Sequence, residues 1–495
     1  MKRRWLFALL AFPSIAIAVA SDPPNPNLLD RVETILSVFV AALEKFFFFG
    51  QKPDGTGIPL IVLWTIVAAV FFTVRLGFIN LRAFQHAVYV IRGHYDNPEE
   101  PGEVTHFQAL TAALSATVGL GNIAGVAIAI QAGGPGAAFW MTVAGLLGMS
   151  SKFVECTLAQ KYRKVKPNGR IGGGPMYFLS EGLARKGLKG FGQVLAAVFA
   201  IACILASLGS FGANQSYAAL SGIVQLPSPF YGAIAALLVG LVIIGGIRRI
   251  GQVTSALVPA MAGLYAAGAL WIVLANLPQI PAAVASIFTE AFSPKAVVAG
   301  GLMGALVNGL KRAAYSNEAG LGSAAIAHAA AKTTEPVREG VVALLEPFID
   351  TVVVCNLTAT ILIVTGAYQD TSLEGIEVTL AAFESVVEWF PIVLAIAAFL
   401  FAFTTMITWS YYGEQCWVYL FGDRAVLVYR LLFVTFIFIG ATIDNLDIII
   451  NFSDMMLFTM AFPNLLGCFF LSNEVSRDLN SYMSRLRTGE LPIYK

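Results

Sequence analysis

The chain has 495 residues, of which 57% are apolar and only 12% are charged, and its mean hydropathy is +0.74. Soluble domains carry roughly 25% charged residues, so this composition excludes a water-soluble fold and predicts a protein whose main solvent is lipid. The net charge of +1 leaves no basic surface for nucleic acid. The five cysteines have no metal-like spacing and are expected to be buried thiols.

The chain begins with a sequence typical of a secretory signal peptide. Three basic residues precede an apolar stretch, the small residues Ala18-Val19-Ala20 and a polar segment. We therefore predict a signal-peptide-like segment at 1–20, with an uncleaved anchor as the alternative. Both interpretations place 21–57 outside the cytoplasm. Within it, 28–49 is apolar but interrupted by charges, and we expect an amphipathic interfacial helix there.

Eleven apolar runs follow, and each can be a membrane span. A hydrocarbon layer of roughly 30 Å requires about 20 apolar residues of helix. The predicted spans are 58–79, 107–131, 136–160, 191–222, 229–246, 252–275, 296–325, 341–366, 391–421, 425–443 and 447–472. The fold class is therefore an all-α polytopic membrane protein.

The distribution of charge gives the orientation. Lys and Arg gather in the loops of one side, most densely between 161 and 190, and by the positive-inside rule that side is the cytoplasm. The tail 473–495 is then cytoplasmic and 21–57 is external, in agreement with the signal-like start. The external loop 366–391 has five acidic residues and no basic one. We interpret it as a solvated loop; weak attraction of cations is the alternative.

The second predicted span contains three glycines and an asparagine within seven residues, in Gly119-Leu120-Gly121-Asn122-Ile123-Ala124-Gly125. Glycine weakens a helix, and freed backbone groups in lipid need partners, so we expect a break that lines a cavity. In transporters with such helices, unwound carbonyls hold a cation and the next half-helix points its amides at a substrate carboxylate. The alternative is close packing of a neighbouring helix on the glycines.

The seventh predicted span repeats this pattern in Gly300-Gly301-Leu302-Met303-Gly304-Ala305-Leu306-Val307-Asn308. It lies five spans after the first, as expected if 107–275 and 296–472 are five-helix repeats of opposite topology. The run at 58–79 is then an extra transmembrane helix before the first repeat.

Four ordered motifs carry a family resemblance. They are Thr117-Val118-Gly119-Leu120-Gly121-Asn122-Ile123-Ala124-Gly125-Val126-Ala127, then Gly133-Gly134-Pro135-Gly136 with Phe139-Trp140-Met141, then Gly173-Gly174-Pro175-Met176-Tyr177, and Lys311-Arg312 with Ser316-Asn317-Glu318-Ala319-Gly320-Leu321-Gly322. Together they resemble the alanine/glycine:cation symporter family over about 58–472. The resemblance implies a leucine-transporter-like fold with a 5+5 inverted repeat, coupling to Na⁺ or H⁺, and alanine or glycine as substrate. Thr142 departs from the family pattern, which has Trp there.

The resemblance also implies a sodium site. A small hard cation wants about five oxygen ligands, and neutral oxygens suit an ion that must also leave. The implied ligands are the carbonyls of Ser115, Val118 and Phe401 and the hydroxyls of Thr404 and Thr405. In an apolar helix, however, threonine hydroxyls commonly bond their own backbone instead.

A substrate site is expected at the same break. The amides of Gly119, Leu120, Gly121 and Asn122 are candidates for the carboxylate. Asn214 or Gln215 is expected to make polar contacts, and since adjacent helical residues point about 100° apart, at most one of them faces the pocket. The pocket walls are predicted to include Met303, Gly304, Phe403 and Trp409.

Charged residues inside the spans are costly unless paired or hydrated. Lys152 and Glu155 stand three apart, and we expect them to pair along one helix face. Asp350 and Glu346 have no local cation. A salt bridge to Arg312 or another basic residue of the inner side is expected for them, with a proton relay or gate as the alternative.

These observations predict a secondary active symporter in a bacterial inner membrane that imports alanine or glycine with Na⁺, or less readily H⁺, by alternating access. A channel or an amino-acid sensor on the same fold is the alternative. No nucleotide-binding, metal or nucleophile motif indicates an enzyme, and no cofactor besides the coupling ion is expected.

Overall fold

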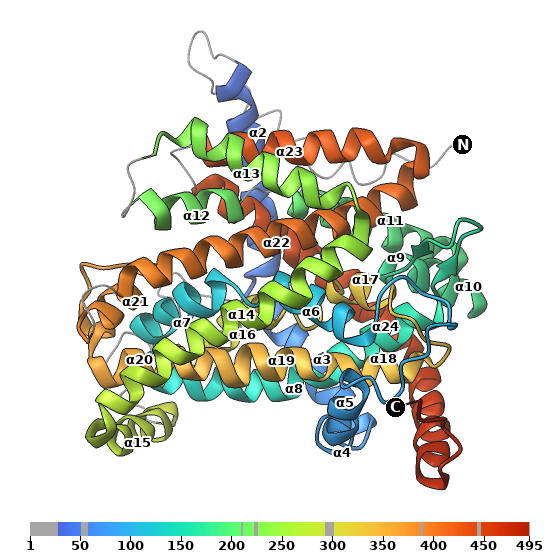
Figure 1. Cartoon of the computed structure of the whole chain (residues 1–495), viewed down its shortest axis with the longest axis horizontal. Coiled ribbons are helices and arrows are strands. Elements are labelled where there is room, and N and C mark those ends of the chain that lie inside the picture. Colours follow the sequence, from blue (N-terminus) through green and yellow to red (C-terminus); the bar gives the residue numbers. More distant parts are fainter. Residues whose placement is uncertain are drawn as a thin grey trace.

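The computed structural model describes residues 28–50, 58–208, 211–221, 226–292, 301–386, 390–442 and 447–494. The signal-like segment 1–20 lies outside them. The described part is built from helices packed along one long axis, with a single two-stranded antiparallel hairpin of β1 (Lys164–Val165) and β2 (Ile171–Gly172). Figure 1 shows α7 (Leu120–Gly133) and α21 (Ile376–Glu384) toward one end of this axis and α10 (Leu183–Arg185) toward the other.

Seven helices of the described part are long and apolar enough to cross a membrane. They are α8 (Gly136–Lys161), α11 (Lys189–Ser207) with its continuation, α14 (Gly246–Ala275), the run Pro336–Thr365, α22 (Phe390–Phe421), α23 (Val426–Thr442) and α24 (Asp447–Thr488). The run Pro336–Thr365 comprises α18 (Pro336–Ala343), α19 (Leu345–Pro347), the π-helix η3 (Phe348–Cys355) and α20 (Asn356–Thr365). The protein is therefore an integral membrane protein, as its composition predicts.

The other predicted spans are broken or short. The run 107–131 is a pair of helices, α6 (His106–Thr117) and α7, bent by 43° at the glycine-rich segment. Three more predicted spans contain the shorter helices α3 (Leu60–Arg75), α13 (Ser228–Ile243) and α16 (Gly301–Asn317). Each of the eleven predicted runs thus contains a helix, and the 5+5 repeat stays a prediction.

Several described elements were not expected from the sequence. The run 191–222 contains α11, which ends at Ser207, and α12 (Phe211–Ser221), and together they supply the span Lys189–Asn214. Additional short helices occupy loops: α4 (Ile79–Arg82), α5 (Phe84–Ile91), α9 (Pro175–Tyr177), the π-helix η1 (Phe178–Gly182), α15 (Ile280–Ala291), α17 (Ala324–His328) and α21 in the acidic loop. The helix predicted near 28–49 is α2 (Leu28–Phe47), which packs on α24 through Phe47 and Phe458, with ring centroids 5.9 Å apart.

Small residues let the helices around α8 approach closely. A Cβ atom on Gly309 of α16 would lie 2.5 Å from the Ala137 carbonyl oxygen of α8, and one on Gly340 of α18 would overlap Thr157. Helices in lipid associate largely by this kind of backbone approach. The backbones of α16 and α18 therefore pack directly against α8.

Candidate functional site

The break between α6 and α7 is stabilised by its own sequence. Gly119 has an extended backbone with φ −163° and ψ −154°, and its N–H donates to Asn122 Oδ1 at 2.9 Å. The Asn122 N–H donates back to the Gly119 carbonyl at 3.1 Å. An asparagine side chain that satisfies a free amide at a helix start is a capping interaction, and in a membrane it replaces a partner that water cannot supply.

Asn122 also connects the break to two other helices. Its side-chain Nδ2 contacts the Asp350 carboxylate of η3 and the Ser316 hydroxyl of α16, the latter at 3.1 Å. Ser316 donates to Asp350 Oδ2 at 2.5 Å, and Thr351 donates to the same oxygen at 2.8 Å. All four side chains are buried. The Asn122 side chain is therefore committed to this network, and of the amides at the start of α7, those of Leu120 and Gly121 have no intrahelical carbonyl to bond.

A cavity of about 1480 Å³ reaches the break. Four predicted site residues line it: Gly119, Gly121, Thr405 and Trp409. A Cβ atom on Gly121 would meet nothing within 4 Å, so this glycine faces open space. The acidic loop contributes 371–377 to the cavity wall.

Oxygen atoms gather where α6 meets α22. The Thr405 hydroxyl donates to the Ser115 carbonyl at 2.9 Å, and the hydroxyls of Ser115 and Thr408 are 2.5 Å apart. The Thr404 hydroxyl donates to the Phe401 carbonyl at 3.0 Å and lies 3.7 Å from Met261 Sδ of α14. Ser115 and Thr405 thus bring together neutral oxygens of the kind that suits Na⁺, so these two residues fit a sodium ion, whereas the contacts of Thr404 are to its own helix and to α14.

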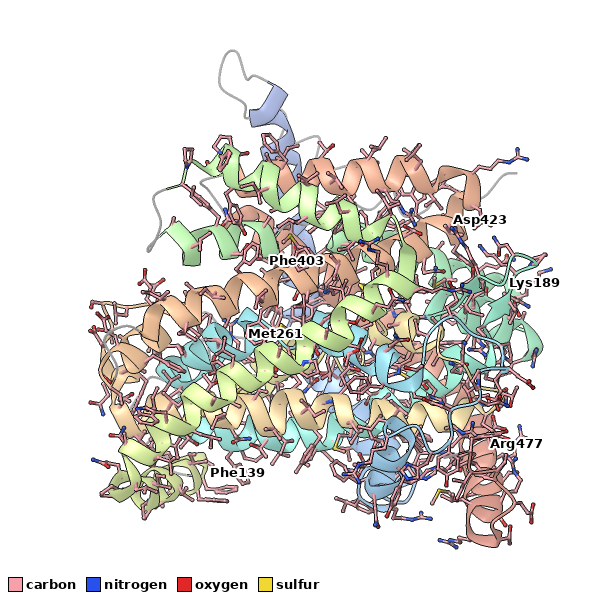
Figure 2. All side chains as sticks on the ribbon, in the orientation of Figure 1. Phe139, Lys189, Met261, Phe403, Asp423 and Arg477 are labelled. Carbon is pink, nitrogen blue, oxygen red and sulfur yellow. The ribbon has the colours of Figure 1, made fainter. Side chains whose placement is uncertain are left out.

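The remaining predicted site residues are placed as follows. Val118 ends α6 as its C-cap residue, and Asn214 is buried in α12. Phe403 stacks on Phe399 at 6.4 Å between centroids, and Figure 2 shows it and Met261 on neighbouring helices. Gly304 lies against Gly133 of α7. The side chains of Leu120, Gln215 and Met303 lie outside the described residues.

The pairings predicted for Lys152 with Glu155 and for Asp350 with a basic residue are wrong, whereas Glu346 does form a salt bridge to a basic residue, Lys152. Lys152 pairs with Glu346 at 2.8 Å, while Glu155 accepts a hydrogen bond from Asn464 at 3.0 Å. Helical spacing alone cannot reveal a partner 194 residues away, and Lys152 pairs with that distant residue instead of with Glu155. Within the described part of the chain, Asp350 bonds neutral groups and makes no salt bridge to Arg312.

Sequence reasoning did not assign site roles to Ser316, Thr351 and Thr408. The first lies in a recognised motif, Ser316-Asn317-Glu318, and its position five spans after Asn122 was a usable signal. Thr408 lies one helical turn after Thr404 and Thr405, and the pattern of hydroxyls on one helix could have included it. Thr351 follows Asp350 directly and carries no separate signal.

A broken membrane helix, a capped half-helix and a cavity at the break define a membrane transporter of the leucine-transporter-like class. The fold is similar to that in the crystal structure of MhsT in complex with L-phenylalanine, with a TM-score of 0.53 and 14% identity over 75% of this chain and 89% of that one. The chain belongs to the sodium:alanine symporter family, whose model matches residues 48–495. It is therefore a transporter and not an enzyme.

Two relatives illustrate the range of the family. The sodium/alanine symporter AgcS of Methanococcus maripaludis is 39% identical over 87% of this chain and 96% of its own length. The probable sodium/glutamine symporter GlnT of Bacillus subtilis is 33% identical over 88% of this chain and 90% of its own. Membership of the family therefore establishes amino-acid symport, but it does not identify the amino acid.

Proposed function

We propose that this protein imports a small neutral amino acid, alanine or glycine, together with Na⁺ by alternating access in a bacterial inner membrane. The observation that carries the proposal is the break at Gly119, where the start of α7 and Thr405 border one cavity and the Thr405 hydroxyl bonds the Ser115 carbonyl. A substrate and an ion held there would lie within one shared structural unit, which is what coupling requires.

The substrate carboxylate is expected at the start of α7. The amides of Leu120 and Gly121 lie at a helix N-terminus, where unbonded N–H groups and the helix dipole favour an anion. The open space at Gly121 accommodates the backbone of a small amino acid, and Trp409 and Met406 on α22 border the same cavity. Discrimination by bulk then favours alanine and glycine over larger side chains. The name of the alanine-transporting relative supports the same choice.

The coupling ion is expected among the oxygens of Ser115, Val118, Phe401, Thr404 and Thr405. When Na⁺ binds, the Thr405 hydroxyl turns its lone pair to the ion and gives up its bond to the Ser115 carbonyl, so that both oxygens become ligands. The family and the names of the relatives support Na⁺. If protons were the coupling ion instead, Asp350 would be the first residue to test, because its buried carboxylate has only neutral hydrogen-bond partners among the described residues.

The cavity is proposed to open to the outside. Its wall includes Glu374 and Glu377 of the acidic loop and Phe48 of the segment 21–57, which the loop charges assign to the external face. Arg312 lines the same wall, because it lies within α16 and not in an inner loop as the sequence predicts. The described conformation is then outward-facing, and inward release requires the opposite ends of α6 and its neighbours to separate.

Uptake of labelled alanine into proteoliposomes, with Na⁺ and pH gradients imposed separately, tests the proposal. We expect accumulation driven by inward Na⁺ alone. Counterflow separates a carrier from a channel, because only a carrier exchanges labelled for unlabelled alanine faster when the latter is on the far side. Uptake that ignores both gradients, or the absence of counterflow, would contradict the proposal.

A further inference from the structure

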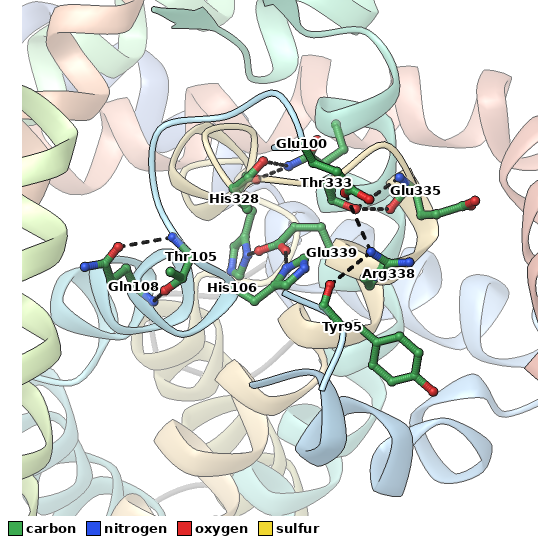
Figure 3. Close-up of polar contacts among 12 residues, drawn as sticks. Tyr95, Glu100, Thr105, His106, Gln108, His328, Thr333, Glu335, Arg338 and Glu339 are labelled. Carbon is green, nitrogen blue, oxygen red and sulfur yellow. Dashed lines mark hydrogen bonds and ion pairs between the residues drawn. The ribbon is translucent and has the colours of Figure 1, made fainter. Parts of the chain in front are cut away.

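A chain of buried ionisable groups lies at the end of α6 remote from the break. Glu339 of α18 accepts a bond from Nδ1 of His106, the first residue of α6, and from Nδ1 of His328 in α17, the latter at 2.6 Å. Figure 3 shows both imidazoles directed at this one carboxylate. All three side chains have 0% exposure.

The chain continues to α8. His328 Nε2 lies 3.8 Å from Glu346 Oε2, and Lys152 Nζ lies 2.8 Å from Glu346 Oε1. Lys152 and Glu346 are likewise fully buried. Lys152 offsets only one of the two carboxylates, and an uncompensated charge in this position is costly. A second proton on one imidazole offsets this charge.

The geometry identifies which one. The Nε2 atoms of both histidines and Oε2 of Glu346 have no hydrogen-bond partner in the described structure. Of the two nitrogens, His328 Nε2 faces a carboxylate oxygen, so an added proton is best placed there. Burial by itself would lower the pKa of His328, but its hydrogen bond to Glu339 and the nearby Glu346 carboxylate raise that pKa to about 9.

The other ionisable groups near the chain supply no further positive charge to its carboxylates. Glu318 accepts a bond from the Ser323 hydroxyl, and Asp350 accepts bonds from Ser316 and Thr351. Arg163 donates to the carbonyls of Ala329, Ala331, Pro101 and Thr333. Arg338 bonds the Tyr95 carbonyl and lies 3.7 Å from Glu100, and Glu155 is held by Asn464. Cys156 is a buried free thiol of α8 and adds no charge. Among the described residues, the two histidines are therefore the groups placed to supply the second positive charge.

The same region is joined by backbone bonds. The Glu103 N–H donates to the Ala330 carbonyl at 2.8 Å, and the Lys332 N–H donates to the Val104 carbonyl at 2.8 Å. Thr105 and Gln108 then form a capping box at the start of α6. The segment 103–106 is thus fixed to 328–332, and the start of α6 cannot move while these contacts hold.

We infer that His106, Glu339 and His328 form the inner closure of the transport path and that this closure binds one proton. The inference rests on the proposed alternating access, in which the inner end of α6 must separate from α17 and α18. A proton on His328 stabilises the closed arrangement. Because the pKa is raised on closure, this contribution is full below about pH 6.5, the ordinary value for histidine, and is lost as the pH rises through about 9.

Cys156 reports the state of the closure. It is fully buried in α8, in a cluster with Ala325, Ala329 and Ala343 beside the ionisable chain. A membrane-impermeant maleimide added to inside-out vesicles should reach it only when the inner side opens. Modification of the Cys156 peptide is measured by mass spectrometry, and at each pH the rate is divided by that of the unfolded protein, which removes the intrinsic pH dependence of thiols.

We expect His106→Gln to label about tenfold faster than wild type at pH 7, because a charged, buried hydrogen bond is weakened. The wild-type rate should rise between about pH 7 and 9.5, and His328→Gln should lose this dependence. His86→Gln is the matched control, since His86 is a buried histidine of α5 that bonds Tyr482 at 2.8 Å instead. It should label like wild type.

Two results would overturn the inference: wild-type labelling of His106→Gln, or a normalised wild-type rate that does not change with pH. Slow labelling in right-side-out vesicles shows that a variant is folded, because an unfolded protein reacts from both sides. Alanine and Na⁺ binding are measured in the same vesicles. If Cys156 labelling follows the expected pattern but alanine and Na⁺ do not bind, the proposed substrate and ion are wrong and the inferred closure still stands.

Discussion

Gly121 is the residue whose missing side chain contributes most to the proposed pocket. A Cβ atom there would meet nothing within 4 Å, and leucine favours a helix over glycine by roughly 0.8–1 kcal/mol. We predict that Gly121→Leu folds normally but binds no detectable alanine, because its side chain fills the space in front of the α7 amides. Thermal melting and equilibrium binding measure the two effects.

Gly263→Leu is the control for this substitution. Gly263 also has open space at its Cβ position, but it lies on the exposed face of α14, outside the cavity lining. It should keep wild-type affinity. Unchanged alanine affinity in Gly121→Leu would show that the glycines at the break serve helix packing only.

Thr404 and Thr405 provide the two side-chain oxygens of the proposed sodium site. Replacing both with Val keeps the side-chain volume and removes two of about five ligands. We predict that the double variant loses the dependence of alanine affinity on Na⁺. Thr435→Val, which removes a hydroxyl bonded only to the Leu431 carbonyl on exposed α23, should leave that dependence unchanged. If the alanine affinity of the double variant depends on Na⁺ as much as that of the wild type, these threonines are not part of the sodium site.

Asp350 holds the network that fixes Asn122. Asp350→Ala leaves the buried Ser316 hydroxyl and Asn122 amide without this acceptor, at about 1–3 kcal/mol each. We predict about tenfold weaker alanine binding and a lower melting temperature. Asp350→Asn keeps an acceptor oxygen and should retain most of both. Equal affinity in the Ala variant and wild type would show that the network does not position the break.

At the scale of elements, the Lys152–Glu346 pair joins α8 to α19. Removing one partner of a buried pair leaves an uncompensated charge and costs about 3–5 kcal/mol. We predict a strong loss of thermal stability in Lys152→Met and substantial recovery in Lys152→Met with Glu346→Leu. Lys161→Met, on the same helix, removes a partly exposed pair with Asp478 and should cost less than about 1 kcal/mol. No difference between the two single variants would contradict this account of α8.

Elements also show what sequence can and cannot predict. The break at Gly119 was predictable because three glycines and an asparagine weaken an apolar helix where water cannot satisfy the backbone. Helix α21 was not, because the acidic sequence 366–391 reads as a solvated loop. The Lys152 partner was missed for another reason. Spacing within a helix gives only local neighbours, whereas the buried partner comes from a helix far along the chain.

For the whole molecule, composition and apolar runs predicted a membrane protein with helices in every expected span. The oxygens of Ser115 and Thr405, predicted from two distant segments, lie together. The Asp350 network and the His106–Glu339–His328 closure were not predicted, because each is assembled from residues that carry no pattern of their own until the helices are packed. Sequence therefore located the break, and the packing revealed what holds it and what closes the inner side.

The central claim is that alanine and Na⁺ share one structural unit at the break. It is tested most directly by measuring alanine affinity of the purified protein over a range of Na⁺ concentrations, and Na⁺ affinity with and without alanine. Linkage requires that each ligand raise the affinity for the other by the same factor, and we expect a factor of about 5 to 150. An alanine affinity that is independent of Na⁺ would contradict the account.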